Sequence, residues 1–373
     1  MSNNLLPWSL ENWSSSKTTN WFMMEEYQLF APNAILCSEV KIGPYTFIFN
    51  SIAKDDIAQT LITARVRLFI NNSSKKEQQE TLSFDAHVGD EISGLISIGL
   101  GIKVFCAGIS RRFNPPNSKF GDPYGEPCFS EQFSPPGLHT AELFPILPDV
   151  TAAICSPSEG HLSTLESLEF ATPDRYKAFI RSACLYKDAL DMVDHDPNLS
   201  WILMVSALET AAVVEPEFEI SPEQVLKDSF PSLYETLQNC ADPTVVHKVA
   251  PIVAPTLKAT SKFIGFCLRH LPGEPCSRPD DIDARVIWSL ENIKKILSTV
   301  YGHRSNYLHT GQRFPSLMSK APIKFEEKPN IEKEKDWLSR EWKERDVPIN
   351  LHTFNYLTRH ILLNWCRTFK PKD

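Results

Sequence analysis

Residues 286–311, VIWSLENIKKILSTVYGHRSNYLHTG, decide the fold of the C-terminal half. Apolar residues recur here at spacings of three and four, as in the buried stripe of an amphipathic helix. They are Val286, Leu290, Ile293, Leu297 and Val300. We predict one long helix over 281–309, with Asp280 and Asp281 as suitable N-caps. The next position in the rhythm is Arg304. Because a guanidinium stays charged and is costly to bury alone, Arg304 requires an anion, an acidic partner or water.

Outward from this stretch, similar recurrences predict further helices in the same half of the chain. The segment 198–214 is apolar nearly all round, so we place it at the centre of a helical bundle. Pro173 is a plausible first residue of the preceding helix, and other helices are predicted at 222–239, 255–271 and 349–369. We therefore expect residues 165–373 to form an all-α domain that folds independently.

The N-terminal half is rich in β-branched and aromatic residues, at 35–52, 60–70 and 95–113. Segment 60–69, TLITARVRLF, alternates in part between apolar and polar residues, which indicates a strand with one wet face. Prolines and glycines crowd residues 114–160, so this segment is expected to be an ordered connector. The predicted class is α+β, with a β-rich domain over residues 1–160 followed by the helical bundle.

The amino-acid composition indicates a folded protein without a disulfide framework or a zinc site. With 373 residues, 42% of them hydrophobic and 23% charged, the chain is expected to fold as two domains. Its nine cysteines are odd in number and lack a C-x-x-C pair, which favours neither a disulfide framework nor a zinc site. The N-terminus has no secretory pattern, and the most apolar segment, 201–214, is short and contains Glu209. We expect a soluble, cytoplasmic protein that does not enter a membrane.

Charge is distributed unevenly along the chain. The net charge of −8 argues against a surface that grips long nucleic acid indiscriminately. Residues 248–324, however, contain twelve Lys and Arg against five Asp and Glu. This local excess of positive charge would suit one short phosphodiester segment, or it is an accident of the chosen window.

Arg304 and His309 carry the chemistry that we expect. A guanidinium can clamp two phosphate oxygens and stabilise charge in a transition state. An imidazole with an unperturbed pKa near ~6.5 can move a proton at neutral pH. In an ideal helix the two side chains are about 140° apart, so they flank a groove and do not share a face. A helix break near Gly302 or Gly311, or a second subunit, would bring them together.

These residues resemble a known signature. The segment 301–311, YGHRSNYLHTG, resembles the R-x4-6-H motif of HEPN domains, and most closely the ApeA-like branch, whose R-S-x-x-x-H-x-G pattern ends a long helix. The segment 203–209, LMVSALE, is similar to that branch's apolar helix with an embedded acid. The resemblance covers about residues 165–370. One departure is Ser305 directly after the arginine, with Asn306 one position later, where HEPN nucleases frequently carry Asn, Asp or His.

The resemblance implies a function. Catalytic HEPN proteins cleave RNA without metal or other cofactor in a composite cleft built from two motifs, with the 2′-OH of the RNA as nucleophile. Carried over, Arg304 orients the scissile phosphate and His309 acts as acid or base. Glu209, Ser305, Asn306 and Tyr307 would support them. The resemblance further implies a homodimer through the helical domain, with RNA as partner. It also implies a trigger sensed by the N-terminal domain and a role in anti-phage defence or as a toxin.

Other interpretations stay open at this point. Arg304 and Glu209 would also make a structural ion pair, and His309 would interact favourably with the helix dipole. The runner-up function is then a non-catalytic HEPN-type dimerisation or RNA-binding scaffold. His303 is expected to be an exposed neighbour, and the two histidines lack a third ligand for a metal. We find no nucleophile elbow or dinucleotide loop, and we assign no chemistry to the charged run 326–346.

Overall fold

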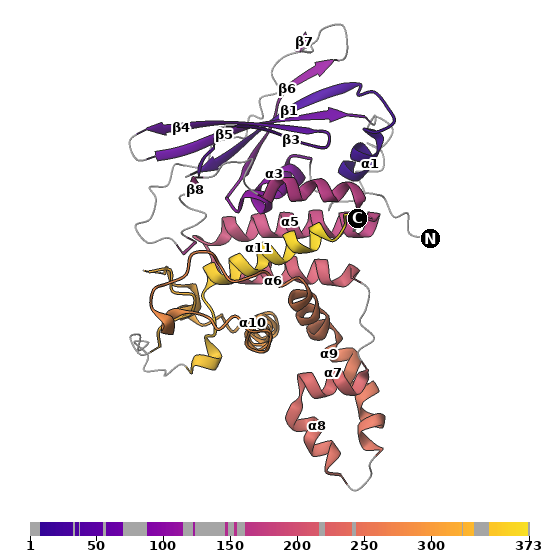
Figure 1. Cartoon of the computed structure of the whole chain (residues 1–373), viewed down its shortest axis with the longest axis vertical. Coiled ribbons are helices and arrows are strands. Elements are labelled where there is room, and N and C mark those ends of the chain that lie inside the picture. The colour runs from indigo at the N-terminus through magenta and orange to yellow at the C-terminus, as the bar shows by residue number, and fades with distance from the viewer. Residues whose placement is uncertain are drawn as a thin grey trace.

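The chain has an α+β fold in which an antiparallel sheet is followed by stacked helices (Figure 1). The computed structural model describes residues 8–32, 34–36, 38–54, 57–69, 88–114, 122–123, 146–147, 153–154, 161–215, 221–240, 244–322, 324–331 and 343–371. The sheet lies at one end of the long axis, α1 and α3 lie beneath it, and the remaining helices follow in layers. The predicted fold class is therefore confirmed.

Among the described residues, six strands form the main sheet in the order β3-β4-β5-β1-β6-β7, and each pairing is antiparallel. Their bounds are Met23–Pro32 (β1), Ser38–Ile42 (β3), Tyr45–Lys54 (β4), Ile57–Leu68 (β5), Phe105–Asn114 (β6) and Asp122–Pro123 (β7). A second, parallel pair joins Ala34–Ile35 (β2) to Ala153–Ile154 (β8). In β5 the burial alternates as the sequence predicts, because one face of the sheet packs on the core and the other meets solvent.

Helices α1 (Trp8–Ser15) and α3 (Val88–Leu100) cover the buried face of the sheet. The prediction of β structure from residue 95 is wrong, since residues 95–100 belong to α3 and the strand begins at Phe105. The reason is packing, because α3 fits closely between the sheet and the helix below it. A Cβ added to Gly94 would lie only 3.1 Å from the backbone nitrogen of Cys184.

Below α3 lies the helical half. Its main elements are a 3₁₀ segment η2 (His161–Phe170), α5 (Pro173–Met192), α6 (Pro197–Val214), α9 (Val245–Arg269), α10 (Leu290–Thr310) and α11 (Leu351–Arg367). Thr172 and Asp196 cap α5 and α6 with their side chains, and Pro173 is the first residue of its helix as predicted. Among the described helices, α6 alone is long and apolar enough to cross a membrane. Half of it is buried between its neighbours, which is the placement of a bundle's core helix.

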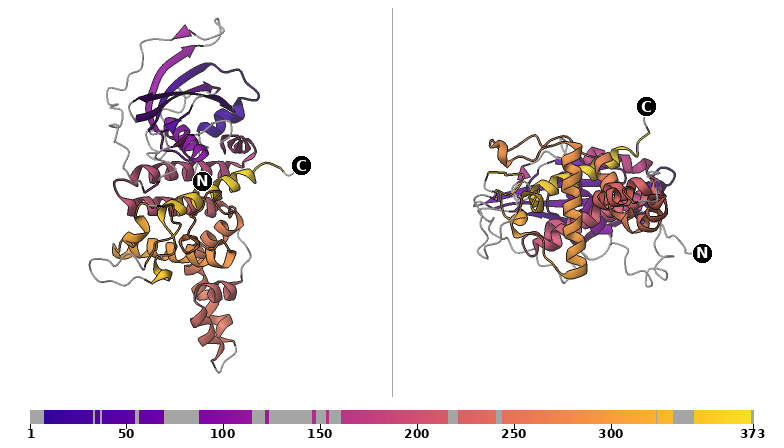
Figure 2. Two further views of the ribbon diagram at one scale, coloured as in Figure 1. Left: turned by 60° about the vertical axis from the view of Figure 1, so that its left-hand side comes forward. Right: turned by 90° about the horizontal axis from the view of Figure 1, so that it is seen from below.

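The predicted helix 222–239 is wrong as a single element. It is two helices, α7 (Pro222–Ser229) and α8 (Pro231–Gln238), because Pro231 has no N–H to continue the hydrogen-bond ladder. Helix α9 begins at Val245, well before the predicted start at Pro255. The helices α7 and α8 and the beginning of α9 form an arm that projects at the opposite end of the molecule from the sheet (Figure 2).

Helix α10 also begins later than predicted, at Leu290, with Ser289 as its N-cap. Asp281 instead caps a short 3₁₀ turn, η3 (Ile282–Ala284). Val286 is buried but lies before α10, and its N–H donates to the Glu327 carboxylate at 2.6 Å. Leu290 is 63% exposed and does not belong to the core. The buried stripe of α10 consists of Ile293, Ile296, Leu297, Val300 and Tyr301.

The two halves share one continuous core. The guanidinium of Arg359 in α11 donates to the carbonyl oxygens of Ile98 (2.8 Å) and Gly99 (2.7 Å) at the end of α3. Lys187 of α5 forms an ion pair with Asp90 of α3 at 3.3 Å. Independent folding of residues 165–373 stays a prediction, and such a fragment would expose the surface of α5 that α3 covers. The predicted connector lies almost entirely outside the described residues, as do Trp337 and Trp342 in the charged run.

Candidate functional site

Helix α10 places Arg304 where its buried stripe meets solvent. Tyr301 is the last buried residue of the stripe, and Arg304 lies one turn further on the same side. A terminal nitrogen of Arg304 donates to Glu209 Oε2 at 2.6 Å, with the two side chains 23% and 21% exposed. The Nε of Arg304 is buried and makes no hydrogen bond to any residue that the structure describes. The guanidinium is thus anchored on one side, and one of its donors lacks a described acceptor.

Tyr301 is a member of this site that the sequence analysis missed. Its hydroxyl donates to Glu209 Oε1 at 2.8 Å, so one carboxylate joins Tyr301 and Arg304. The Arg304 guanidinium carbon lies 5.6 Å from the centre of the Tyr301 ring, and Phe263 packs on that ring at 5.0 Å. Burial, followed by the bond to Glu209, raises the pKa of Tyr301 to about 12. The available signal was the spacing, because residues three apart on a helix are neighbours.

Glu209 reaches the site from α6, where it interrupts a nearly all-apolar helix. The ion pair that the sequence left open between Glu209 and Arg304 is present. A partly buried pair contributes little net stability, but removing one partner leaves the other charge unsatisfied at a cost of about 1–3 kcal/mol. Glu209 therefore fixes where Arg304 points, and it reduces the positive charge that Arg304 presents.

His309 lies in the last turn of α10, exposed to solvent. The helix is continuous from Leu290 to Thr310, so no break occurs at Gly302. Gly311 ends it in the left-handed conformation, with φ of 71° and its N–H bonded to the Tyr307 carbonyl. Because this end follows His309, the separation of about 140° from Arg304 expected for a regular helix is preserved. Within one chain the two side chains do not converge.

The other predicted supporting residues lie around this helix end. Ser305 is partly exposed and Asn306 is exposed. In the described part of the chain, no side-chain hydrogen bond connects either residue to Arg304 or His309. Tyr307 packs at the edge of the core. The structure therefore brings Arg304 together with Glu209 and Tyr301, but not with Ser305, Asn306 or His309.

His303 is not the exposed neighbour that we expected. It is partly buried, its Nε2 lies 2.8 Å from the Asp346 carbonyl oxygen, and its ring centre is 5.7 Å from that of Phe314. Burial lowers the pKa of His303, which favours the neutral ring. His303 thus attaches the segment before α11 to α10, which is a structural role.

Two exposed apolar side chains flank the ion pair. Leu308 follows Arg304 by one turn on α10 and is 51% exposed. Val213 follows Glu209 by one turn on α6 and is 68% exposed. Residues four apart on a helix lie on the same side, so both belong to the surface around the pair. Solvent-exposed apolar groups beside a polar centre are typical of surfaces that bind another molecule.

The described residues contain no group of three His, Cys, Asp or Glu side chains that could hold a metal ion. No family model, curated protein or solved structure matches the chain. The site offers a fixed guanidinium with free donors and a carboxylate that orients it. An accessible imidazole lies about 1.4 turns further along the same helix.

Proposed function

We propose that this chain is a metal-independent endoribonuclease of the HEPN type. The observation that carries the proposal is Arg304 at the solvent end of a buried stripe, bound to Glu209 through one terminal nitrogen while its Nε is unsatisfied among the described residues. Such a guanidinium is oriented in advance and still has donors for the oxygens of a phosphate. His309 follows on the same helix as an accessible proton carrier.

In the proposed reaction, Arg304 binds the scissile phosphate and stabilises the charge that develops on it. The 2′-OH of the RNA attacks phosphorus and loses its proton, the bond to the 5′-oxygen breaks, and that oxygen gains a proton. His309 carries out one of the two proton transfers. The products are a 2′,3′-cyclic phosphate and a free 5′-OH. Glu209 and Tyr301 act as positioning residues because they contact Arg304 and not the substrate.

We propose a homodimer because one chain separates Arg304 from His309 around the helix. A two-fold axis near the ends of two α10 helices would place an imidazole of one copy beside a guanidinium of the other. The exposed side chains of Leu308 and Val213 support this arrangement, since an interface there would bury them. Each composite site would then contain residues from both copies.

A second candidate function is a non-catalytic HEPN-type scaffold that dimerises or binds RNA. The short contact between Arg304 and Glu209 favours it, because a guanidinium neutralised by a carboxylate is a poorer phosphate ligand. The separation of His309 from Arg304 in one chain favours it as well.

Mass spectrometry of RNA incubated with the purified protein separates the two functions. New ends bearing 2′,3′-cyclic phosphate, formed equally well in EDTA, are expected for the nuclease. Intact RNA under conditions in which the protein is dimeric would reject the nuclease and favour the scaffold.

The nuclease proposal includes a cytoplasmic location and a role in anti-phage defence or as a toxin. The free thiols among the described cysteines support a reducing compartment.

A further inference from the structure

One row of side chains crosses five neighbouring strands of the sheet on the face away from the helices. The strand register pairs Lys41 with Thr46, Thr46 with Arg65, Arg65 with Glu26, and Glu26 with Arg111. These five residues, which we call the cross-strand row, come from β3, β4, β5, β1 and β6 in spatial order. With neighbouring strands about 4.8 Å apart, the row is about 19 Å long.

The row lies on the open face of the sheet. Tyr27, Phe47 and Ala64 are next to row residues in sequence and are buried, so they point to the core. Helices α1 and α3 cover that inner face, and the opposite face is directed away from them (Figures 1 and 2). The side chains of Arg65 and Arg111 are 40% and 53% exposed.

Glu26 organises the two arginines of the row. Its side chain is fully buried, and its carboxylate accepts the Nε–H of Arg65 at 2.7 Å and that of Arg111 at 2.6 Å. The Arg111 guanidinium also lies over the Phe113 ring at 5.5 Å. Because each arginine uses its Nε for Glu26, its terminal nitrogens remain for a ligand on the open face. Two cations share one buried anion, so the centre of the row keeps a positive charge.

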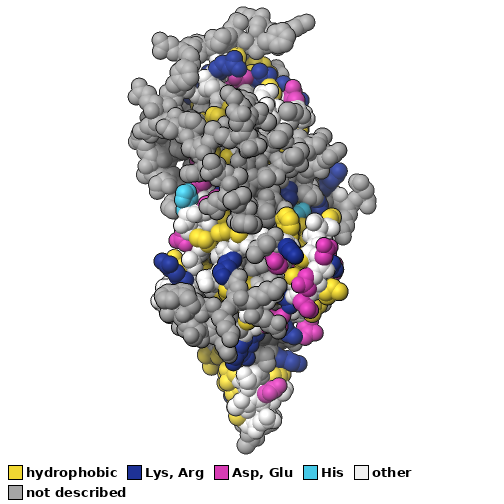
Figure 3. Space-filling view, turned by 90° about the vertical axis from the view of Figure 1, so that its left-hand side faces the viewer, with side chains coloured by type: hydrophobic (Ala, Val, Ile, Leu, Met, Phe, Trp, Pro, Cys, Tyr) yellow, Lys and Arg dark blue, Asp and Glu magenta, His cyan; other side chains and the backbone are white. Residues whose placement is uncertain are grey.

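Further cations extend this charge over the face. Lys41 ends the row, and Arg67 follows Arg65 by two residues on the same side of β5. Polar groups lie in the next row, where Gln28 donates to the Ser110 hydroxyl at 3.1 Å. Glu39, two residues before Lys41 on β3, places a second negative charge on this face in addition to Glu26. Some Lys and Arg side chains are visible at the sheet end of the molecule, with Asp or Glu side chains beside them (Figure 3).

We infer that the open face of the sheet binds a single strand of RNA along the cross-strand row. Two guanidinium groups held on either side of one carboxylate suit the oxygens of successive phosphates, and Lys41 extends the contact to a third. An open antiparallel sheet is an established platform for single-stranded RNA. A basic surface in a chain of net charge −8 also favours a polyanion. The choice of RNA rests on the proposed function, although binding here does not require cleavage.

The row is remote from the candidate cleavage site. Helices α3, α5 and α6 lie between the sheet and α10 (Figure 1). RNA bound to the row is therefore a separate anchor, which holds a part of the substrate away from the scissile bond. This gives the N-terminal half the task of retaining RNA through its backbone charge and not through its base sequence.

The test measures binding in the full-length His309→Ala protein, so that cleavage does not interfere. Fluorescence anisotropy follows a labelled single-stranded RNA of about 15 nucleotides, which exceeds the row in length. Replacing Glu26, Arg65 and Arg111 together by Gln keeps hydrogen-bonding groups but removes the charges. Since two phosphate contacts are lost, Kd should rise about 20-fold near 0.1 M salt, and the salt dependence should fall by about 1.4.

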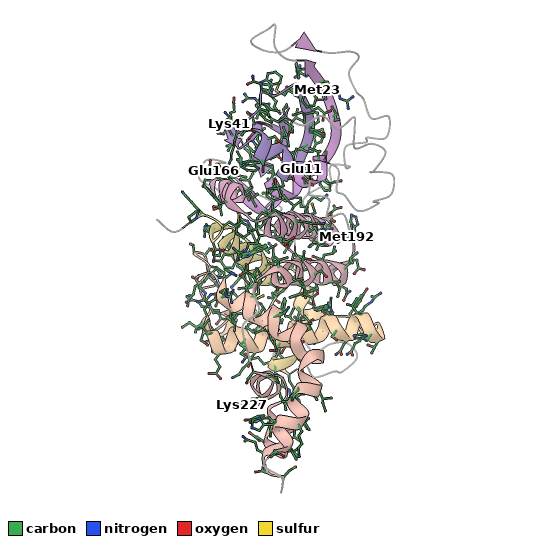
Figure 4. The ribbon with its side chains drawn as sticks, turned by 90° about the vertical axis from the view of Figure 1, so that its right-hand side faces the viewer. Glu11, Met23, Lys41, Glu166, Met192 and Lys227 are labelled. Carbon is green, nitrogen blue, oxygen red and sulfur yellow. The ribbon has the colours of Figure 1, made fainter. Side chains whose placement is uncertain are left out.

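Two further single variants serve as controls for misfolding and for net charge. Lys41→Gln changes an exposed side chain and should raise Kd about fivefold, as expected for one lost phosphate contact. Lys227→Gln removes the same net charge as the triple variant, but from the arm at the other end of the molecule, and should leave Kd unchanged (Figure 4). An unchanged Kd in Lys41→Gln and in a folded triple variant would overturn the proposal. So would stronger binding of an acidic peptide than of RNA at this row.

The result is separable from the nuclease proposal. Wild-type protein that binds RNA through the row but forms no cyclic phosphate ends would leave the anchor standing and reject the nuclease. If the triple variant binds and cleaves RNA like the wild type, the RNA anchor on the sheet is rejected and the nuclease proposal stands.

Discussion

The Arg304 guanidinium of α10 lies 2.6 Å from the Glu209 carboxylate of α6, and Tyr301 donates to the same carboxylate at 2.8 Å. This pair connects the core helix of the bundle to the helix that ends at the candidate site. The buried Nε of Arg304 still lacks an acceptor among the described residues. The pair therefore sets the direction of Arg304 without using all of its donors.

Arg304→Ala and His309→Ala should each reduce RNA cleavage about a hundredfold or more, because one removes phosphate binding and the other a proton transfer. The double variant should be little worse than either single variant, since both groups act on one phosphate. Initial rates on a fluorescent RNA, with circular dichroism to verify folding, provide the measurement. Full activity in either folded single variant would exclude this chemistry.

Glu209→Gln should distinguish positioning from simple stability. The amide oxygen can accept from Arg304 while the amide NH2 donates to the Tyr301 hydroxyl, so the melting temperature should change little. Cleavage should fall because a neutral amide holds the Arg304 guanidinium in place less firmly than a carboxylate does. Glu209→Ala should also lower stability, by about 1–3 kcal/mol, because Arg304 is left unpaired. Unchanged kcat in a folded Glu209→Gln protein would leave the pair with a structural role alone.

The raised pKa of Tyr301 predicts a loss of stability at high pH. Its pKa is raised from 10.0 to about 12 in the folded protein, so the folded state holds the proton more tightly than the unfolded state. Stability from this group should be constant below pH 10 and decrease as the pH rises from about 10 to about 12. Urea unfolding of wild type and Tyr301→Phe should show a loss in this range that is smaller in the variant. Equal losses would contradict the assignment.

Two histidines with lowered pKa values should reduce the stability of the folded protein at acid pH. Burial lowers the pKa of His352 and of His270 from 6.5 to about 4. Their unfolded forms bind protons more readily, so stability present above pH 6.5 should be lost as the pH falls towards 4. The loss for His352 is on the order of 3 kcal/mol. His352→Gln should reduce the pH dependence of the urea midpoint between these values, and an unaltered dependence would contradict it.

Leu308→Glu should convert a dimer to a monomer, because it places a charge in the proposed interface. Sedimentation of the wild type should give a mass near twice 42.3 kDa. The control is Ile282→Glu, at a side chain that is 76% exposed and lies before α10, and it should remain dimeric. A monomeric wild type that still cleaves RNA would refute the requirement for two copies.

The sequence by itself determined the features that depend on near neighbours. The nearly all-apolar composition of residues 198–214 identified the core helix around Glu209. The spacing of apolar residues identified the stripe that leads to Arg304, because residues three or four apart share a helix face. Partial alternation identified β5, because a strand directs successive side chains to opposite faces. The sequence also named Glu209 as a partner for Arg304, since a buried charge requires an opposite one.

Only the tertiary structure decided features that depend on residues far apart in the chain. Val286 lies before the helix and not on its stripe, and its N–H donates to Glu327, which is 41 residues away in the sequence. Residues 95–100 are helical and belong to α3, which packs closely against α5 at Gly94. Glu26 receives its two arginines from strands on either side of β1. The physical reason is the same each time, since a local sequence pattern records preferences of a fraction of a kcal/mol per residue, which packing and buried hydrogen bonds between distant segments outweigh.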